Sequence, residues 1–251
     1  MLIISQFYLY VIKIFENIEY LFYNNYVDYM LKILLGLLPG LLLFIYFFSI
    51  FKPKDKKKFI IILILVVLGS IGSYFCYRLE MHYGSFFKKV KDSNYLEILF
   101  YAFFGVAIFE EGYKWFVTLF ASFFDKYKKK YNLFLYSIFT SISFATFENI
   151  VYFVIPYGIN TAISRIFSAI PSHVLNAIWM GFFLEKYSNT KSKKKYFYLF
   201  LSLIVPTLVH ALYNSFLYGG KYQAFFYYYY IPFLIITIIF YILIRRKVIE
   251  I

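Results

Sequence analysis

The chain is poor in residues on which soluble folds and several kinds of site depend. It has one cysteine, Cys76, among 251 residues, which excludes an intrachain disulfide and a thiolate metal site. Charged residues make up only 16% of the chain and hydrophobic residues 62%. A soluble domain of this length has too small a core to bury that much apolar surface. The composition therefore indicates a membrane protein.

Acidic residues are scarce as well, with 13 Asp and Glu against 26 Lys and Arg. A net charge of +13 can indicate nucleic-acid binding, but here the lysines occur in short clusters between apolar runs, where they mark cytoplasmic loops. The clusters lie at residues 52–58, 126–130, 186–195 and 245–247. We therefore expect the lipid bilayer as a partner, and no nucleic acid.

Apolar runs of about 20 residues recur along the chain, which is the length needed to cross about 30 Å of hydrocarbon. They predict an all-α, polytopic transmembrane helix bundle with about seven spans. The positive clusters fall at every second boundary, so the amino terminus is expected outside the cell membrane and the carboxyl terminus in the cytoplasm. The predicted spans are residues 31–51, 59–77, 97–124, 133–155, 161–184, 196–218 and 223–244.

The amino-terminal residues differ from these spans. Residues 1–24 carry Lys13, Glu16 and Glu19 inside an apolar run and lack a small-residue cleavage site. We expect an amphipathic helix lying in the membrane interface, with an eighth span as the alternative. The predicted organisation is an interfacial segment, 1–30, and a transmembrane domain, 31–251, whose polar core lies in 97–218.

Strongly polar groups occur in the middles of the four central spans and not in those of the first, second and last. A charge at the centre of a membrane helix costs roughly 2.5 to 3.5 kcal/mol, so it normally faces the protein interior or water. At 1.5 Å per residue from the cytoplasmic end, an acid or imidazole in each central span lies roughly 16 to 23 Å deep. The polar residues of these spans are Glu110, Glu111, Lys114, Glu148, Asn149, Arg165, His173, Asn176, His210 and Asn214.

Spacing places several of these residues on shared helix faces. Lys114 is four residues after Glu110 and three after Glu111, so it can neutralise either carboxylate. His210 and Asn214 are four residues apart and also share a face. Each residue has a plainer structural explanation, as a buried ion pair that fixes helix register or as a hydrogen bond between helices.

Taken together, three carboxylates and two imidazoles at one depth exceed what register control needs, and they indicate catalysis or transport. Arg165 is the exception, because it lies near the outer end of its span and is expected to extend toward the lipid headgroups.

This inventory is sufficient to hydrolyse a peptide bond, which needs a base for the attacking water and donors for the oxyanion. The same groups suit a zinc ion, because two histidines and a glutamate form a known catalytic zinc set. The ligands would then be His173, His210 and Glu148. The motifs H-E-x-x-H, G-x-G-D and G-x-S-G are absent, so the familiar zinc, aspartyl and serine membrane-protease signatures are not present.

The ordered set of motifs resembles the PrsW family, which is grouped with CAAX prenyl endopeptidases and bacteriocin-immunity membrane proteins. The motifs are E110-E111-x-x-K114, F144-x-x-x-E148-N149, His173 and H210-x-x-x-N214, and the resemblance covers roughly residues 97–218. It implies an intramembrane endopeptidase. The implied substrate is a single-pass membrane protein, such as a membrane-anchored anti-sigma factor, cut at the extracytoplasmic side.

By matching position, the resemblance implies that Glu110 or Glu111 is the base, with Lys114 as its partner. It also implies that His210 and Asn214 are oxyanion donors, and that His173 completes the site. The CAAX relatives carry histidine where this chain has Glu148, so the role of Glu148 stays open. The wider family is labelled metallopeptidase, whereas its prenyl-protease relatives look like glutamate-dependent enzymes without a catalytic metal. A zinc cofactor is therefore left open.

Two other functions remain as alternatives. Buried Glu, Lys and His can form the proton relay of a proton- or cation-coupled transporter. A non-catalytic scaffold or immunity protein can keep the same polar layer as a means of joining helices.

Overall fold

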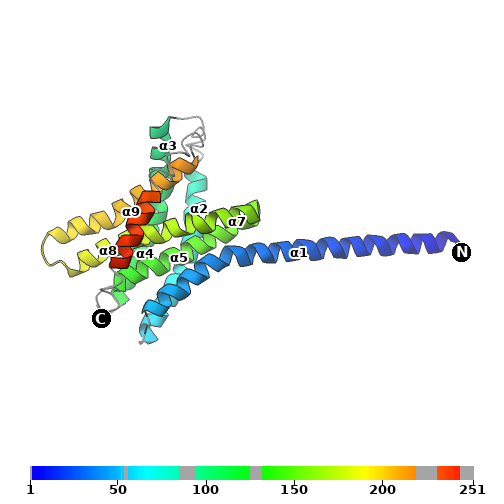
Figure 1. Ribbon diagram of the computed structural model, residues 1–251, viewed down its shortest axis with the longest axis horizontal. Helices are drawn as coiled ribbons and strands as arrows, with labels where there is room; N and C mark the ends of the chain where they lie inside the picture. Colours follow the sequence, from blue (N-terminus) through cyan, green and yellow to red (C-terminus); the bar gives the residue numbers. More distant parts are fainter. Residues whose placement is uncertain are drawn as a thin grey trace.

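The structure is a computed structural model that describes residues 2–51, 53, 56–84, 94–124, 132–218 and 231–243. Within these ranges every regular element is a helix, which confirms the predicted all-α bundle (Figure 1). The elements are α1 Leu2–Phe51, α2 Lys56–Gly84, α3 Tyr95–Tyr101, η3 Ala102–Ala107, α4 Ile108–Phe124, α5 Asn132–Glu148, η4 Asn149–Val154, α6 Ile155–Tyr157, α7 Ile159–Phe167, α8 Ala169–Asn189 and α9 Lys194–Tyr218. A further short helix is Ile231–Leu243.

Five described helices are long and apolar enough to cross a membrane, and each corresponds to one predicted span. The predicted third span is the unbroken run of α3, η3 and α4. The predicted seventh span is described only as the shorter apolar helix Ile231–Leu243, and its other residues lie outside the described part of the chain. The five long helices are Tyr26–Ile50, Lys56–Tyr83, Asn132–Tyr157, Ser164–Asn189 and Lys194–Tyr218.

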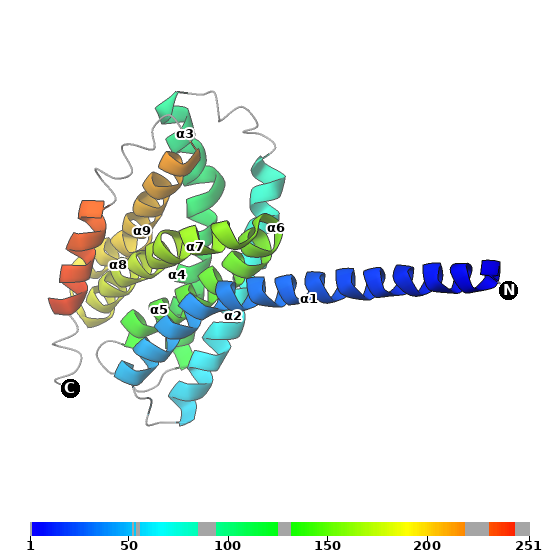
Figure 2. The ribbon, with the colours of Figure 1, turned by 45° about the vertical axis from the view of Figure 1, so that its right-hand side comes forward.

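The first helix, α1, is continuous from Leu2 to Phe51, with no break at the predicted boundary after residue 30. Its later part packs against the bundle through Phe47 and its neighbours. Its amino-terminal part extends away from the other helices (Figures 1 and 2). The interfacial placement of residues 1–24 stays a prediction.

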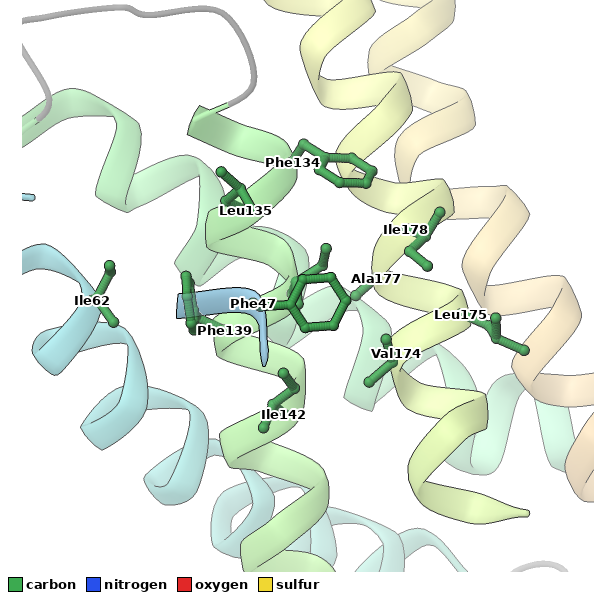
Figure 3. Packing of buried hydrophobic residues seen from close by; sticks show 11 residues of the cluster. Phe47, Ile62, Phe134, Leu135, Phe139, Ile142, Val174, Leu175, Ala177 and Ile178 are labelled. Carbon is green, nitrogen blue, oxygen red and sulfur yellow. The ribbon is translucent and has the colours of Figure 1, made fainter. Parts of the chain in front are cut away.

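The centre of the bundle is α5, in which every residue from Asn132 to Ala145 is buried. Its apolar side chains form a cluster with residues of α1, α2 and α8 (Figure 3). Its small hydroxyl residues hydrogen-bond backbone carbonyls of neighbouring helices, as Ser137 does with Ala177 and Ser141 with His173. Small polar residues let membrane helices approach closely. At Gly181 of α8, for example, a Cβ would overlap Phe134 Cα of α5.

The predicted fourth and fifth spans are interrupted near the connection between them. The α5 helix changes to a π-helical turn, η4, directly after Glu148. The chain then turns at Gly158, whose φ of 85° is in a region that favours glycine. A second break at Ser168 separates α7 from α8. Such π-helical turns are frequent at functional sites, and these breaks place Arg165 on a short helix next to Glu148.

Candidate active site

Four helices deliver the predicted acids, lysine and histidines to one buried cluster. The face of α4 that carries Glu111 and Lys114 is buried, and both side chains are 0% exposed. The opposite face of α4 exposes large aromatic residues, including Phe116 and Phe120. Because a charge exposed to lipid is costly, α4 directs its apolar face outward and its charged face into the bundle. The other helices contribute Glu148 at the end of α5, His173 from α8 and His210 from α9.

Lys114 lies at the centre of the cluster. Its Nζ atom is 2.7 Å from Glu111 Oε1, 3.4 Å from Glu110 Oε2 and 3.1 Å from His173 Nδ1. The ammonium group also lies 4.4 Å from the centroid of the Phe144 ring, a cation–π arrangement. The lysine thus contacts both carboxylates of α4 and one imidazole. The contacts with the two carboxylates agree with the three- and four-residue spacing in the sequence.

His210 contacts the same two carboxylates. Its Nδ1 atom is 2.8 Å from Glu111 Oε1, and its Nε2 atom is 3.9 Å from Glu110 Oε2. Glu111 Oε1 is therefore shared by an ammonium and an imidazole, whereas Glu111 Oε2 is buried with no hydrogen-bond partner among the described residues. One carboxylate oxygen is fixed and the other is available to a further ligand.

The structure corrects the expectation for Arg165. Instead of extending to the headgroups, its Nη2 atom lies 2.8 Å from Glu148 Oε1, and its Nε donates to Asn149 Oδ1 at 2.9 Å. The side chain is 11% exposed. The break before α8 brings the arginine back over the end of α5, so that it neutralises Glu148 inside the protein.

Glu148 in turn contacts an imidazole of the cluster, with its Oε2 atom 2.9 Å from His173 Nε2. Because the Lys114 ammonium can only donate, His173 Nδ1 accepts with its lone pair, and Nε2 carries the proton beside this carboxylate. A carboxylate that fixes the tautomer of a histidine in this way is common around catalytic and metal-binding imidazoles. Glu148 therefore acts on the cluster through His173.

Asn149 is next to Glu148 in the chain, but its side chain forms hydrogen bonds to other helices. Its Nδ2 donates to the carbonyl oxygen of Gly36 in α1 at 3.0 Å, while its Oδ1 accepts from Arg165. This is the interhelical role that the sequence left open for it. Asn214, one turn after His210 on α9, is buried at 8% exposure. It lies on the face of α9 predicted from the spacing of the two residues.

Sequence reasoning missed Glu80, which it assigned to a loop because the predicted second span ended at residue 77. In the structure α2 continues to Gly84, so Glu80 belongs to this helix and is half-buried. The sequence did contain a signal for this placement, because Glu80 follows directly after an apolar run whose helix could continue beyond residue 77.

The buried cluster has several side-chain atoms that can bind a metal ion. Glu110, Glu111, His173 and His210 each offer one ligand atom, and these atoms all lie within 4.8 Å of one another. Carboxylate oxygen and imidazole nitrogen are ordinary zinc ligands, and the unpartnered Glu111 Oε2 and the His173 lone pair add to this fit. The donor set therefore suits zinc, although the Lys114 ammonium contacts three of the four residues. Glu148, placed in the ligand set from sequence, pairs with Arg165 and lies outside this group.

Comparison with known proteins agrees with this geometry. A model of the family described as PrsW family intramembrane metalloprotease matches residues 57–243. A relative from Oceanobacillus iheyensis named Protease PrsW is 33% identical over 186 residues, which are 73% of this chain and 81% of that protein. Protease PrsW of Bacillus subtilis is 29% identical over 196 residues, covering 72% and 80%. No solved structure is detectably similar.

The helical membrane bundle, its buried cluster and these relatives define the chain as an intramembrane protease. It belongs to the PrsW family. Family membership favours the protease function over the transporter and scaffold alternatives. It also confirms the resemblance to the PrsW family that the motifs of the four central spans indicated.

Proposed function

We propose that the protein hydrolyses a peptide bond of a membrane-anchored protein with a water molecule activated by Glu111. The observation that carries this proposal is the unequal environment of the two Glu111 oxygens. Lys114 and His210 hold Oε1 at 2.7 and 2.8 Å, while Oε2 is buried without a partner among the described residues. A carboxylate fixed by one oxygen can accept a proton from water on the other.

The remaining groups supply what the reaction needs after attack. The tetrahedral intermediate carries a negative oxygen, which requires hydrogen-bond donors in a water-excluded site. Asn214 has an amide N–H₂ group one turn from His210, and a protonated His210 can donate from Nε2. The proton that Glu111 takes from water can then pass to the leaving amine by way of His210, whose Nδ1 atom contacts Glu111, so that both side chains return to their starting state. Lys114 keeps a compensating positive charge next to both carboxylates.

His173 would complete the site with its Nδ1 atom directed at the cluster, held in orientation by Glu148 and Arg165. Glu110, Glu111, His173 and His210 would hold a zinc ion, which supplies a Lewis acid that polarises the attacking water. With or without the ion, the chain excludes bulk water and presents donors to the oxyanion. Glu111 Oε2 would act as the base only where it does not itself hold the ion.

The proposed substrate is a single-pass membrane protein, with an anti-sigma factor as the candidate implied by the family resemblance. The buried depth of the cluster favours a peptide bond within or next to a membrane span. The alternation of lysine clusters supports an amino terminus outside the cell membrane, a carboxyl terminus in the cytoplasm and cleavage toward the extracytoplasmic side.

The test compares cleavage of a panel of single-pass membrane proteins by reconstituted wild type and two histidine variants. His210→Ala is expected to lower the cleavage rate by about a hundredfold or more, because it removes a group that contacts the base. His82→Ala is the matched control, since His82 is exposed near the end of α2. Equal cleavage by wild type and His210→Ala, with both proteins folded, would end the proposal.

Zinc binding is tested separately from activity. Lys114→Met is expected to raise the affinity for zinc by at least about tenfold, because it removes a cation that contacts the same donors and leaves two buried carboxylates without it. The measurements are the zinc dissociation constant and the rise in melting temperature on adding zinc, which reports binding to the folded state. If neither protein binds zinc, the cluster works as a carboxylate site alone.

A further inference from the structure

Asn176 of α8 is a buried side chain that none of the contacts described so far explains. It is 0% exposed, and neither its Nδ2 nor its Oδ1 atom has a hydrogen-bond partner among the described residues. Leaving a buried amide unpaired costs about 1 to 3 kcal/mol, so such a group usually has a functional reason or a missing partner. Asn149, by contrast, is equally buried and uses both of its amide atoms.

The position of Asn176 connects it with the catalytic cluster. It lies three residues after His173, which contacts Lys114 of α4. Four residues further along α8, Met180 belongs to an apolar cluster against which Trp115 and Leu119 of α4 pack. Residues three, four and seven positions apart share a helix face. Asn176 therefore lies on the stripe of α8 that faces α4, about one turn from the catalytic imidazole.

A second unpartnered group occurs at the corresponding level of α4. Thr118 is four residues after Lys114 and 0% exposed, and its Oγ1 atom has no partner among the described residues. The other threonines in described helices donate to the carbonyl four residues earlier: Thr140, Thr146, Thr161, Thr207 and Thr237. Thr118 departs from this pattern, so α4, which contacts α8 through Lys114 and His173, also keeps a polar group unpaired just beyond the cluster.

We infer that Asn176 binds a backbone peptide group of the substrate next to the scissile bond, with Thr118 opposite. A membrane helix must unwind locally before its peptide bond can be attacked, and its freed N–H and C=O groups then need partners. An asparagine side chain is itself an amide, so it can accept from one N–H and donate to one C=O. One helical turn is about 5.4 Å, which corresponds to one or two residues of extended substrate.

This inference rests on the proposed function and specifies which part of the substrate the site recognises. It requires that Asn176 contribute to substrate binding and little to the stability of the free protein. Replacing an unpaired amide with an apolar side chain of similar shape is neutral or stabilising for a folded protein. Removing a substrate contact that is present before and during the reaction raises KM and leaves kcat unchanged.

The experiment measures cleavage kinetics and thermal unfolding of reconstituted wild type, Asn176→Leu and Asn149→Leu, with a membrane-spanning peptide that the wild type cleaves. Asn176→Leu is expected to raise KM about tenfold, with kcat within about twofold and an undiminished melting temperature. Asn149→Leu is the matched control at a fully paired asparagine, and its melting temperature is expected to fall.

A substrate-side test locates the contact. In a set of such peptides, single peptide bonds on either side of the cleavage site are replaced by esters, which lack the N–H donor. One ester is expected to slow the wild type about tenfold and to have no further effect on Asn176→Leu. Additive effects at every position would overturn the inference.

The inference also fails if Asn176→Leu cleaves like the wild type or loses stability as Asn149→Leu does, which would make Asn176 a structural group. If the leucine variant does not fold, Asn176→Ala adds no atoms and decides the matter by its KM. A wild type that cleaves none of the membrane proteins tested would instead count against the proposed function itself.

Discussion

Glu111→Gln is expected to lower kcat for cleavage of a membrane-spanning substrate by about a thousandfold, the middle of the range for a lost general base. Glutamine has nearly the same shape, but its amide does not take a proton from water. The measurement is single-turnover cleavage by protein reconstituted in lipid. The matched control is Glu97→Gln, because Glu97 lies on the exposed side of α3 in the same helical run.

The neighbouring acid provides an internal comparison. Glu110 Oε2 is 3.4 Å from Lys114 Nζ and 3.9 Å from both imidazoles, so it is held more loosely than Glu111. Glu110→Gln is therefore expected to reduce kcat less than Glu111→Gln does. A larger loss for Glu110→Gln would transfer the role of base to that residue. Retention of at least about a tenth of wild-type activity by both variants would remove the glutamates from the mechanism.

Arg165→Met is expected to destabilise the protein by about 3 kcal/mol, because it leaves the buried Glu148 carboxylate without its counter-ion. It should also reduce activity, since Glu148 orients His173. The free energy of unfolding is measured in detergent for Arg165→Met, Glu148→Gln and the double variant. The two single effects should sum to more than the double variant loses, because each removes the same interaction.

Arg78→Met is the control for losing one positive charge at an exposed position near the end of α2. A surface substitution of this kind is expected to change stability by no more than about 0.5 kcal/mol. If Arg165→Met has an equally small effect, the arginine contributes no more than a headgroup contact. The ion pair with Glu148 would then have no energetic importance.

The sequence was sufficient to predict the helical bundle and several of the residues that the structure brings together in its buried cluster. Apolar runs and helical spacing placed Glu111, Lys114 and His210 on helix faces directed into the bundle. A charged side chain inside a membrane normally faces the protein interior, because its exposure to lipid is costly. Pro156 and Pro171 lie next to the π-helical turn and the break at Ser168 and indicate irregular helix, but they do not give the contacts that Arg165 makes. These contacts depend on packing against other helices, and the predicted role of Arg165 was wrong for that reason.

Contacts between distant helices were also beyond a single sequence. Lys114 contacts His173, which is 59 residues away in the chain. Asn149 bonds to Gly36, which is 113 residues away in the chain. Neither pairing follows from periodicity, since a helical repeat gives the face of a residue and not the identity of the helix opposite.

The hydrogen bond from Asn149 to Gly36 links the longest helix of the protein to catalysis. Asn149 also accepts from Arg165, which pairs with Glu148, which contacts His173. Three side chains, those of Asn149, Arg165 and Glu148, therefore lie between α1 and that imidazole. The helix that extends farthest from the bundle is thereby joined to the buried cluster by a continuous series of side-chain contacts.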